Sequence, residues 1–176
     1  MVPDHFKNKP ENCMVALMMS QQLKVDPLQC LQNSYEVHGK FGLGSSFIIG
    51  LANARGPFVG PLTWDTKGKG DSLEVTCKAV IKQTGEEVSV MVSLAQAKAA
   101  GWTRNPMYKS IPEQMLVYRS ATWLVRRYCP EVLCGLQADD EIIDITPKRQ
   151  TVRVPSSMNR EVDLSTKIDN TGKSDS

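Results

Sequence analysis

The sequence predicts an α+β fold: an antiparallel β-meander, with a hairpin as its clearest part, backed by a long helix and preceded by N-terminal helices. Residues 72–83 and 86–93 alternate apolar and polar side chains on either side of Thr84 and Gly85, a pattern typical of a β-hairpin. From Ile111 onward, apolar side chains recur at helical spacing. Predicted helices and strands are segregated along the chain instead of alternating as βαβ units, which favours α+β.

The first predicted helix covers residues 10–23 and begins with a proline suited to a first turn. Its larger apolar side chains lie mostly along one broad face: Val15, Leu17, Met18, Met19 and Leu23. We interpret this face as part of the core, because a methionine stripe at helical spacing usually packs inside a domain. An adaptable contact surface is the alternative.

Shorter elements follow. In order, we expect a helix at 26–33 capped by Asp26, a strand at 35–38, a flexible break at 42–44, a helix at 46–54 capped by Ser45 and closed by Gly56, and an extended stretch at 58–66. In the first hairpin strand, the buried face alternates with a face that offers Lys78 and Lys82 to solvent.

The last third of the chain predicts a short helix at 94–100, a loop at 102–110 and a long helix that begins near Ile111, with Ser110 as its N-cap and Pro112 in its first turn. A short acidic helix is expected to begin at residues 138–140, where its dipole favours carboxylates. Residues 147–176 are poor in large apolar side chains, so we expect a disordered tail after a core domain at 1–146.

On a helical wheel of the long helix, Arg119, Trp123, Arg126 and Arg127 lie within about a quarter of the circumference. The apolar residues of the helix cluster on the far side: Val117, Ala121, Leu124, Val125 and Tyr128. A solvated basic face is one interpretation. The tryptophan among the arginines favours another, a surface that stacks on and neutralises single-stranded nucleic acid.

Other basic residues recur on predicted strand faces and loops, with aromatic residues among them. The candidate DNA-binding set is Lys40, Arg55, Lys78, Lys82, Arg104, Tyr108, Lys109, Arg119, Trp123, Arg126 and Arg127. Guanidinium groups hold phosphates through a planar fork of donors and read no sequence. Each aromatic side chain is as suited to packing between elements as to stacking on a base.

Of the 21 basic and 19 acidic residues, six and four fall in residues 147–176, which leaves 15 of each in residues 1–146. The body is neutral, yet residues 40–109 hold nine basic and five acidic residues, whereas residues 110–146 hold three and six. Such separated charges suit head-to-tail association of copies with phosphates along the basic stripe. The alternative is that the acids solvate a surface helix.

Nothing in the sequence predicts an enzyme or a cofactor. His5 and His38 are isolated, and the segment 67–72 lacks the spacing of a P-loop, so we expect no ATP site. Five cysteines, with no Cys/His set near enough to complete a tetrahedral site, predict reduced thiols and no metal. With no signal peptide or long apolar run, the chain is expected to be cytoplasmic and to have no membrane partner.

The long helix and its flanks resemble the RecT-type single-strand annealing proteins, the recombinases of phages and prophages. The matching residues are Tyr108, Ile111, Pro112, Glu113, Gln114, Met115, Leu116, Tyr118, Arg119, Arg126, Tyr128, Pro130, Glu131, Gly135, Glu141 and Asp144. Further matches upstream are Asp26, Pro27, Gln32, Asn33, His38, Gly39, Lys40, Asn53, Gly56, Pro57, Ala97, Gly101 and Trp102, so the resemblance spans residues 10–145. Tyr108 stands where the family usually has a tryptophan, and the chain is expected to start inside the family's usual N-terminal region.

The resemblance implies an ATP-independent protein of phage-type homologous recombination that binds the backbone of single-stranded DNA in a basic groove and retains the annealed duplex. It also implies a homo-oligomer, either a ring or a filament, with a phage exonuclease and a host single-strand binding protein as candidate partners. Arg119 and Arg126 are the residues that carry over most directly from the family.

Two other functions remain open from the sequence. The first is an interaction or scaffold module without DNA binding, assembled through the Met-rich first helix and the acidic last helix. The second is a metal-dependent nuclease, because clustered carboxylates hold Mg²⁺. The carboxylates concerned are Asp139, Asp140, Glu141 and Asp144.

Overall fold

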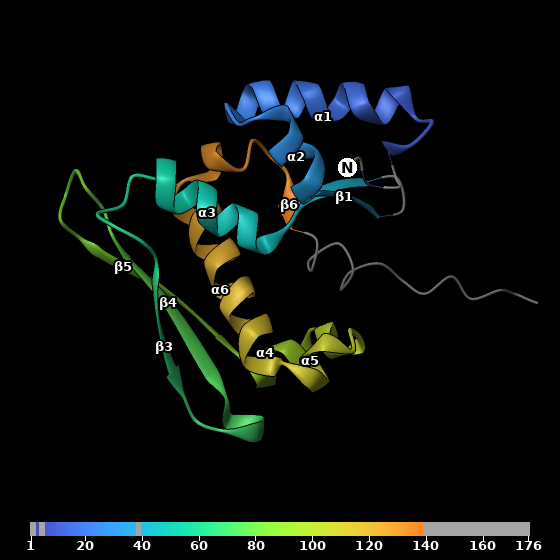
Figure 1. The fold of residues 1–176 in the computed structure, drawn as a ribbon. Helices are drawn as coiled ribbons and strands as arrows, with labels where there is room; N and C mark the ends of the chain where they lie inside the picture. Colours follow the sequence, from blue (N-terminus) through green and yellow to red (C-terminus); the bar gives the residue numbers. More distant parts are fainter. Residues whose placement is uncertain (1–2, 4–5, 38–39, 139–176) are drawn as a thin grey trace, which may run out of the picture. The chain divides into compact units, whose positions relative to one another are not determined.

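The computed structural model describes residue 3, residues 6–37 and residues 40–138, apart from the side chains of Val37 and Lys40. The chain divides into two units, Met1–Thr146 and Pro147–Ser176. The second unit lies outside the described residues, and so does the predicted disorder of the tail. The first unit contains helices and two small sheets (Figure 1), which confirms the predicted α+β class.

The helices are α1 (Pro10–Leu23), α2 (Pro27–Asn33), α3 (Ser45–Arg55), α4 (Leu94–Ala99), α5 (Met107–Ser110) and α6 (Pro112–Tyr128). The strands are β1 (Ser34–Val37), β2 (Lys40–Leu43), β3 (Thr63–Lys67), β4 (Glu74–Val80), β5 (Glu87–Ser93) and β6 (Gln137–Ala138). Within the described residues, 3-10 turns lie at η2 (Gly70–Ser72), η3 (Trp102–Arg104) and η4 (Pro130–Val132).

The predicted meander is present as an antiparallel sheet in the order β3-β4-β5. Its inner face is a row of small and β-branched side chains, all buried: Val75, Cys77, Ala79, Val88, Val90 and Val92. Helix α6 packs against β4 and β5 (Figure 1), so the expectation of a sheet backed by a long helix is also confirmed. One face of the sheet is therefore left to solvent, as is common in antiparallel sheets.

A second sheet was not expected from the sequence. Strands β1 and β2 pair antiparallel, and β6 adds to β2 in parallel through two residue pairs, Gly42 with Gln137 and Leu43 with Ala138. The predicted flexible break at 42–44 is therefore wrong: the glycines are held in and beside a strand. Ala138 ends a strand, and the residues of the predicted acidic helix after it lie outside the described part of the chain.

Local capping signals were informative in some places and not in others. The Asp26 carboxylate accepts hydrogen bonds from the N–H groups of Leu28 at 2.8 Å and Gln29 at 3.3 Å, which confirms it as the cap of α2. Ser45 is not a cap, because α3 begins after Gly44 without a side-chain cap. Gly56 does close α3: a Cβ there would lie 2.4 Å from the carbonyl oxygen of Ala52.

The segment 102–110 is not a loop. It folds into η3 and α5, and Ser110 belongs to α5 instead of capping the next helix, whose N-cap position is Ile111. The Asn105 side chain accepts a hydrogen bond from the N–H of Met107, which holds the turn between η3 and α5. This compact segment packs beside α6, and that placement decides which face of α6 meets solvent.

Helix α1 buries a face that differs from the predicted one. Its buried residues are Asn12, Ala16, Met19, Ser20 and Leu23, whereas Met14, Val15, Leu17 and Met18 are exposed. The expectation that the methionine stripe belongs to the core is thus wrong for two of the three methionines. No helix among the described residues combines the length and apolar character needed to cross a bilayer.

Candidate nucleic-acid interface

Helix α6 carries four of the eleven predicted site residues, Arg119, Trp123, Arg126 and Arg127. Its middle is buried almost all round, because the sheet, α3 and the η3–α5 segment all pack against it. Ala121, Leu124 and Val125 are buried, as their place on the wheel predicted. Met115 and Leu116, which lie on the same side as the arginines, are buried too. Only the ends of the helix have an open side.

Arg119 is not on an open face, so the predicted exposure is wrong for this one of the three arginines. Only 3 % of Arg119 is exposed, and its guanidinium lies 4.2 Å from the centroid of the Trp102 ring, within cation–π distance. The reason is the η3–α5 segment, which covers this part of the stripe. A wheel drawn from the helix sequence alone places residues around an axis but does not show what packs against each side.

Trp123 continues the same stripe one turn further on. Its ring meets Trp102 edge-to-face, with centroids 5.4 Å apart and planes at 88°. Trp102, Arg119 and Trp123 thus form one cluster, in which Trp102 bridges the other two. Trp123 remains half-exposed, while Trp102 is buried. These contacts hold the indole of Trp123 where the arginine-bearing side of α6 is no longer covered by the η3–α5 segment.

Beyond Trp123 the stripe is open. Arg126 and Arg127 are exposed in the last turn of α6, where their charges also favour the negative end of the helix dipole. Together with Trp123 they line a surface hollow, and Arg126 also lines a second hollow beside Leu133 and Gln137. We call Trp123, Arg126 and Arg127 the α6 C-terminal surface. It is the part of the predicted site that the structure brings together.

Three candidate residues lie in the η3–α5 segment, and only two of them are exposed. Tyr108 is only 3 % exposed and belongs to the core, so it is not a stacking surface. It lies in α5, which packs against α6. Arg104 and Lys109, from the same segment, are exposed and remain available to a phosphate.

The candidate residues on the meander are spread along the solvent side of the sheet. Lys78 is half-exposed and forms an ion pair with Asp65 at 2.5 Å, joining β4 to β3. The hydrogen bond from Lys78, and its charge, hold the pKa of Asp65 below its usual value, and the same bond raises the pKa of Lys78. Lys78 therefore has a carboxylate partner within the protein, whereas Lys82 is exposed in the hairpin turn.

The two remaining candidates lie elsewhere. Arg55, at the end of α3, donates a hydrogen bond through Nη2 to the carbonyl oxygen of Lys24 and lines a small hollow with Glu131 and Cys134. It is exposed, but no contact places it beside the α6 C-terminal surface. Lys40 begins β2, and its side chain is outside the described part of the structure.

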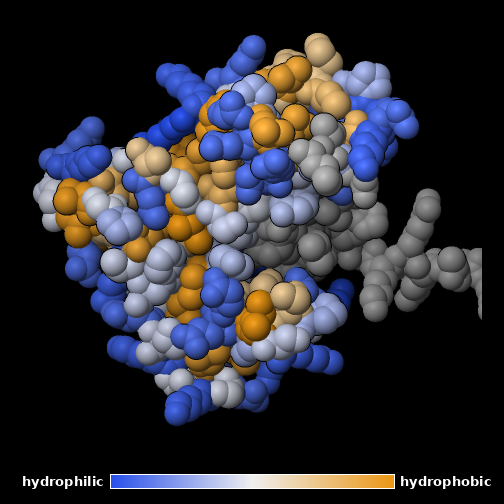
Figure 2. All heavy atoms as spheres, viewed as in Figure 1, coloured by the Kyte–Doolittle hydropathy of each residue, from blue (hydrophilic) through white to orange (hydrophobic). Residues whose placement is uncertain are grey.

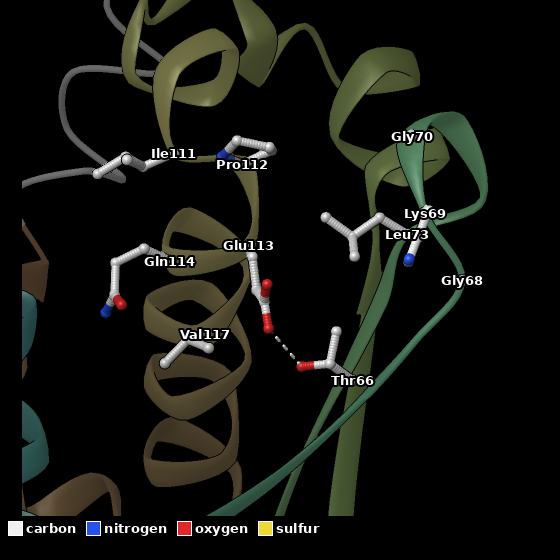
Figure 3. Close-up of a pocket in the computed structure, with 10 residues that line it drawn as sticks. All are labelled: Thr66, Gly68, Lys69, Gly70, Leu73, Ile111, Pro112, Glu113, Gln114 and Val117. Atoms are coloured by element: carbon white, nitrogen blue, oxygen red, sulfur yellow. Dashed lines mark hydrogen bonds between the residues drawn. The ribbon is translucent and has the colours of Figure 1, made fainter.

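A larger cleft opens at the other end of α6, between the helix and strand β3 (Figure 3). The Oγ1 of Thr66 donates a hydrogen bond of 2.9 Å to the carboxylate of Glu113 across it. Lys69 lines the cleft from the connection between β3 and η2. Leu73, Pro112 and Val117 form the apolar part of its wall. Its volume of about 750 Å³ is that of a ligand pocket. A phosphate there would face the Glu113 carboxylate, so the cleft suits a polyanion less well than the α6 C-terminal surface does.

The described residues offer little support for a metal site or for reactive thiols. They contain no group of three or more His, Cys, Asp or Glu side chains close enough to hold a metal ion. The carboxylates of the nuclease hypothesis begin at residue 139 and lie outside them. All five cysteines are free thiols, and burial raises the pKa of both Cys77 and Cys129 to about 12. Those two are protonated at neutral pH.

Trp102 is the residue that sequence reasoning missed. It was noted as a family match but given no role, although it holds both Arg119 and Trp123. The available signal was the apolar pair Met115 and Leu116 on the same side of the helix as Arg119, which indicates that this side packs against another part of the chain. No protein-family model matches the chain, and neither does any curated protein sequence.

Proposed function

We propose that the protein binds single-stranded DNA without sequence preference and anneals complementary strands without nucleotide hydrolysis. The observation that carries the proposal is the α6 C-terminal surface: two exposed arginines flank a half-exposed indole whose ring is fixed from behind by Trp102. Cationic groups that track phosphates, combined with aromatic rings on which bases stack, are the common means of holding single strands.

The two arginines that match the RecT-type pattern have different parts in this proposal. Arg126 is exposed and contacts phosphate through its planar fork of donors. Arg119 is buried against Trp102 and keeps the Trp102–Trp123 pair in place, so it is a positioning residue. The resemblance to annealing proteins supports the choice of DNA over other polyanions, and it is the reason for proposing annealing beyond binding.

In this mechanism the protein supplies alignment and base pairing supplies specificity. Contacts to phosphates leave the Watson–Crick edges of the bases free to test a second strand. Copies bound side by side along one strand hold it extended, which lowers the entropy cost of pairing, and they retain the duplex once it forms. No step requires ATP or a metal ion.

The experiment is annealing of two complementary oligonucleotides, one carrying a fluorophore and the other a quencher, without ATP and with EDTA present. We expect the protein to accelerate quenching over the spontaneous rate. We expect the Arg126→Ala/Arg127→Ala double variant to lose most of that acceleration while its circular dichroism spectrum is unchanged. An unchanged annealing rate in the double variant, or no acceleration by the wild type, contradicts the proposal.

An interaction module without DNA binding is the second candidate, and one observation favours it: the exposed apolar face of α1. A mobility-shift titration with an oligonucleotide at two salt concentrations separates the two functions. A DNA-binding protein shifts the oligonucleotide more at low salt, because binding releases counterions. A scaffold gives no shift at either concentration.

A further inference from the structure

Helix α1 buries one face in its own domain, and its opposite, exposed face is apolar instead of polar. Met14 and Met18 are each 59 % exposed and Leu17 is 43 % exposed. Figure 2 shows hydrophobic side chains gathered on the surface over this helix. No described residue covers them. A helix that buries one side in its own domain and presents methionine and leucine on the other is suited to a second helix.

The spacing along this exposed face is that of a helix-pairing seam. Residues 11, 14, 18 and 21 follow intervals of three and four, and Leu17 flanks the seam. The buried residues of α1 all fall outside these positions. The seam therefore runs the whole length of α1 without competing with the packing of the helix in its own domain.

The charges at the two ends of the seam are complementary when the partner is antiparallel. An antiparallel pair centred between Leu17 and Met18 brings residue 11 of one helix level with residue 24 of the other. Those residues are Glu11, in the first turn, and Lys24, at the C-cap. Both are exposed, and the two-fold symmetry repeats the contact at the opposite end. In a parallel pair, Glu11 would face Glu11 and Lys24 would face Lys24.

We propose that α1 is a self-association surface, which pairs with α1 of a second copy of this chain in an antiparallel, two-fold arrangement. Met18 packs at the centre against Leu17 of the second copy, and Glu11 pairs with Lys24 of the second copy at each end. A 14-residue helix is about 21 Å long. A pair of such helices buries less area than a stable dimer interface, so the dimer is concentration-dependent. This inference does not depend on DNA binding.

The test is sedimentation velocity of the full chain over a wide concentration range. We expect the weight-average mass to rise from 19.5 kDa towards twice that value as concentration increases. Met18→Glu places a carboxylate in the seam and should keep the protein monomeric. Met91→Glu is the matched control, because Met91 is 45 % exposed on β5, away from the seam, and this variant should dimerise like the wild type.

A charge exchange tests the register even if Met18→Glu fails to fold. Glu11→Lys and Lys24→Glu should each weaken self-association at least tenfold, since each places like charges opposite one another. Mixing the two variants should restore a dimer, because a copy of one variant paired with a copy of the other sets a lysine against a glutamate at both ends of the seam. Three results would overturn the proposal: a wild type that stays monomeric, a mixture that does not dimerise, or larger assemblies that survive Met18→Glu, which would indicate another surface or occupant.

Discussion

The guanidinium of Arg119 lies over the ring of Trp102, 4.2 Å from its centroid, and Trp102 in turn meets Trp123 edge-to-face. This relationship joins the η3–α5 segment to the middle of α6. It also separates two arginines that look equivalent in the sequence. Arg119 stabilises the fold, whereas Arg126, two turns further along the helix, lies beyond that cover and is exposed.

Replacing Arg119 should therefore affect stability first. We expect Arg119→Ala to lower the free energy of unfolding by about 2 kcal/mol, from the lost cation–π contact and the space left beside Trp102. Urea denaturation followed by tryptophan fluorescence measures the change. Arg127→Ala, which removes an exposed guanidinium from the same helix, should change stability by less than about 0.5 kcal/mol. Equal effects in the two variants would show that Arg119 is not held as described.

The cap of α2 gives a second stability prediction. Asp26→Ala removes the acceptor for the N–H groups of Leu28 and Gln29, and we expect it to cost about 1 kcal/mol in the free energy of unfolding. Asp26→Asn retains a side-chain oxygen and should cost much less. Thermal or urea denaturation of the pair distinguishes loss of the cap from loss of the charge, which would lower stability in both variants.

The Asp65–Lys78 ion pair predicts a pH dependence. The pKa of Asp65 is held below 3.8, so its contribution to stability is present above the unfolded value and is lost as the pH falls through the lowered folded-state value. In Lys78→Ala we expect the pKa of Asp65 to rise towards 3.8, measured by NMR titration of its carboxyl carbon. Lys82→Ala should leave it unchanged. No rise in Lys78→Ala means that the pair does not form in solution.

Thiol reactivity tests the packing of the core. Burial raises the pKa of Cys77 and Cys129, which are therefore protonated and shielded at about pH 8. We expect an alkylating reagent to label the exposed Cys134 first and to reach Cys77 and Cys129 only after denaturation. Mass spectrometry of timed samples measures the order. Early labelling of Cys77 would place β4 outside the core.

The sequence was sufficient where the signal is local. The hairpin around Gly85, the cap at Asp26 and the long helix after Pro112 each depend on residues close together in the chain, and all three are present. Strand β6 was not predictable in the same way, because two residues become a strand only by pairing with a segment almost a hundred positions earlier.

In the candidate site, too, local features were predicted and features that depend on distant segments were not. The wheel placed Arg126 and Arg127 on an open face, and they are exposed. It placed Arg119 there too, but exposure depends on the η3–α5 segment, whose fold comes from turn contacts such as that of Asn105. The assignment of Met14 and Met18 to the core fails because hydrophobicity alone does not distinguish a buried face of a helix from an exposed one.

The measurement that tests the central proposal most directly is the salt dependence of single-stranded DNA binding, by fluorescence polarisation of a labelled oligonucleotide. Two lost phosphate contacts should make the slope of log K against log[salt] shallower by about 1.4 in Arg126→Ala/Arg127→Ala, with weaker binding at every salt concentration. Lys9→Ala/Lys98→Ala removes the same charge from residues paired with Glu36 and Asp71, and it should match the wild type. If both double variants bind with the wild-type slope and affinity, the α6 C-terminal surface does not hold DNA and the proposed function is wrong.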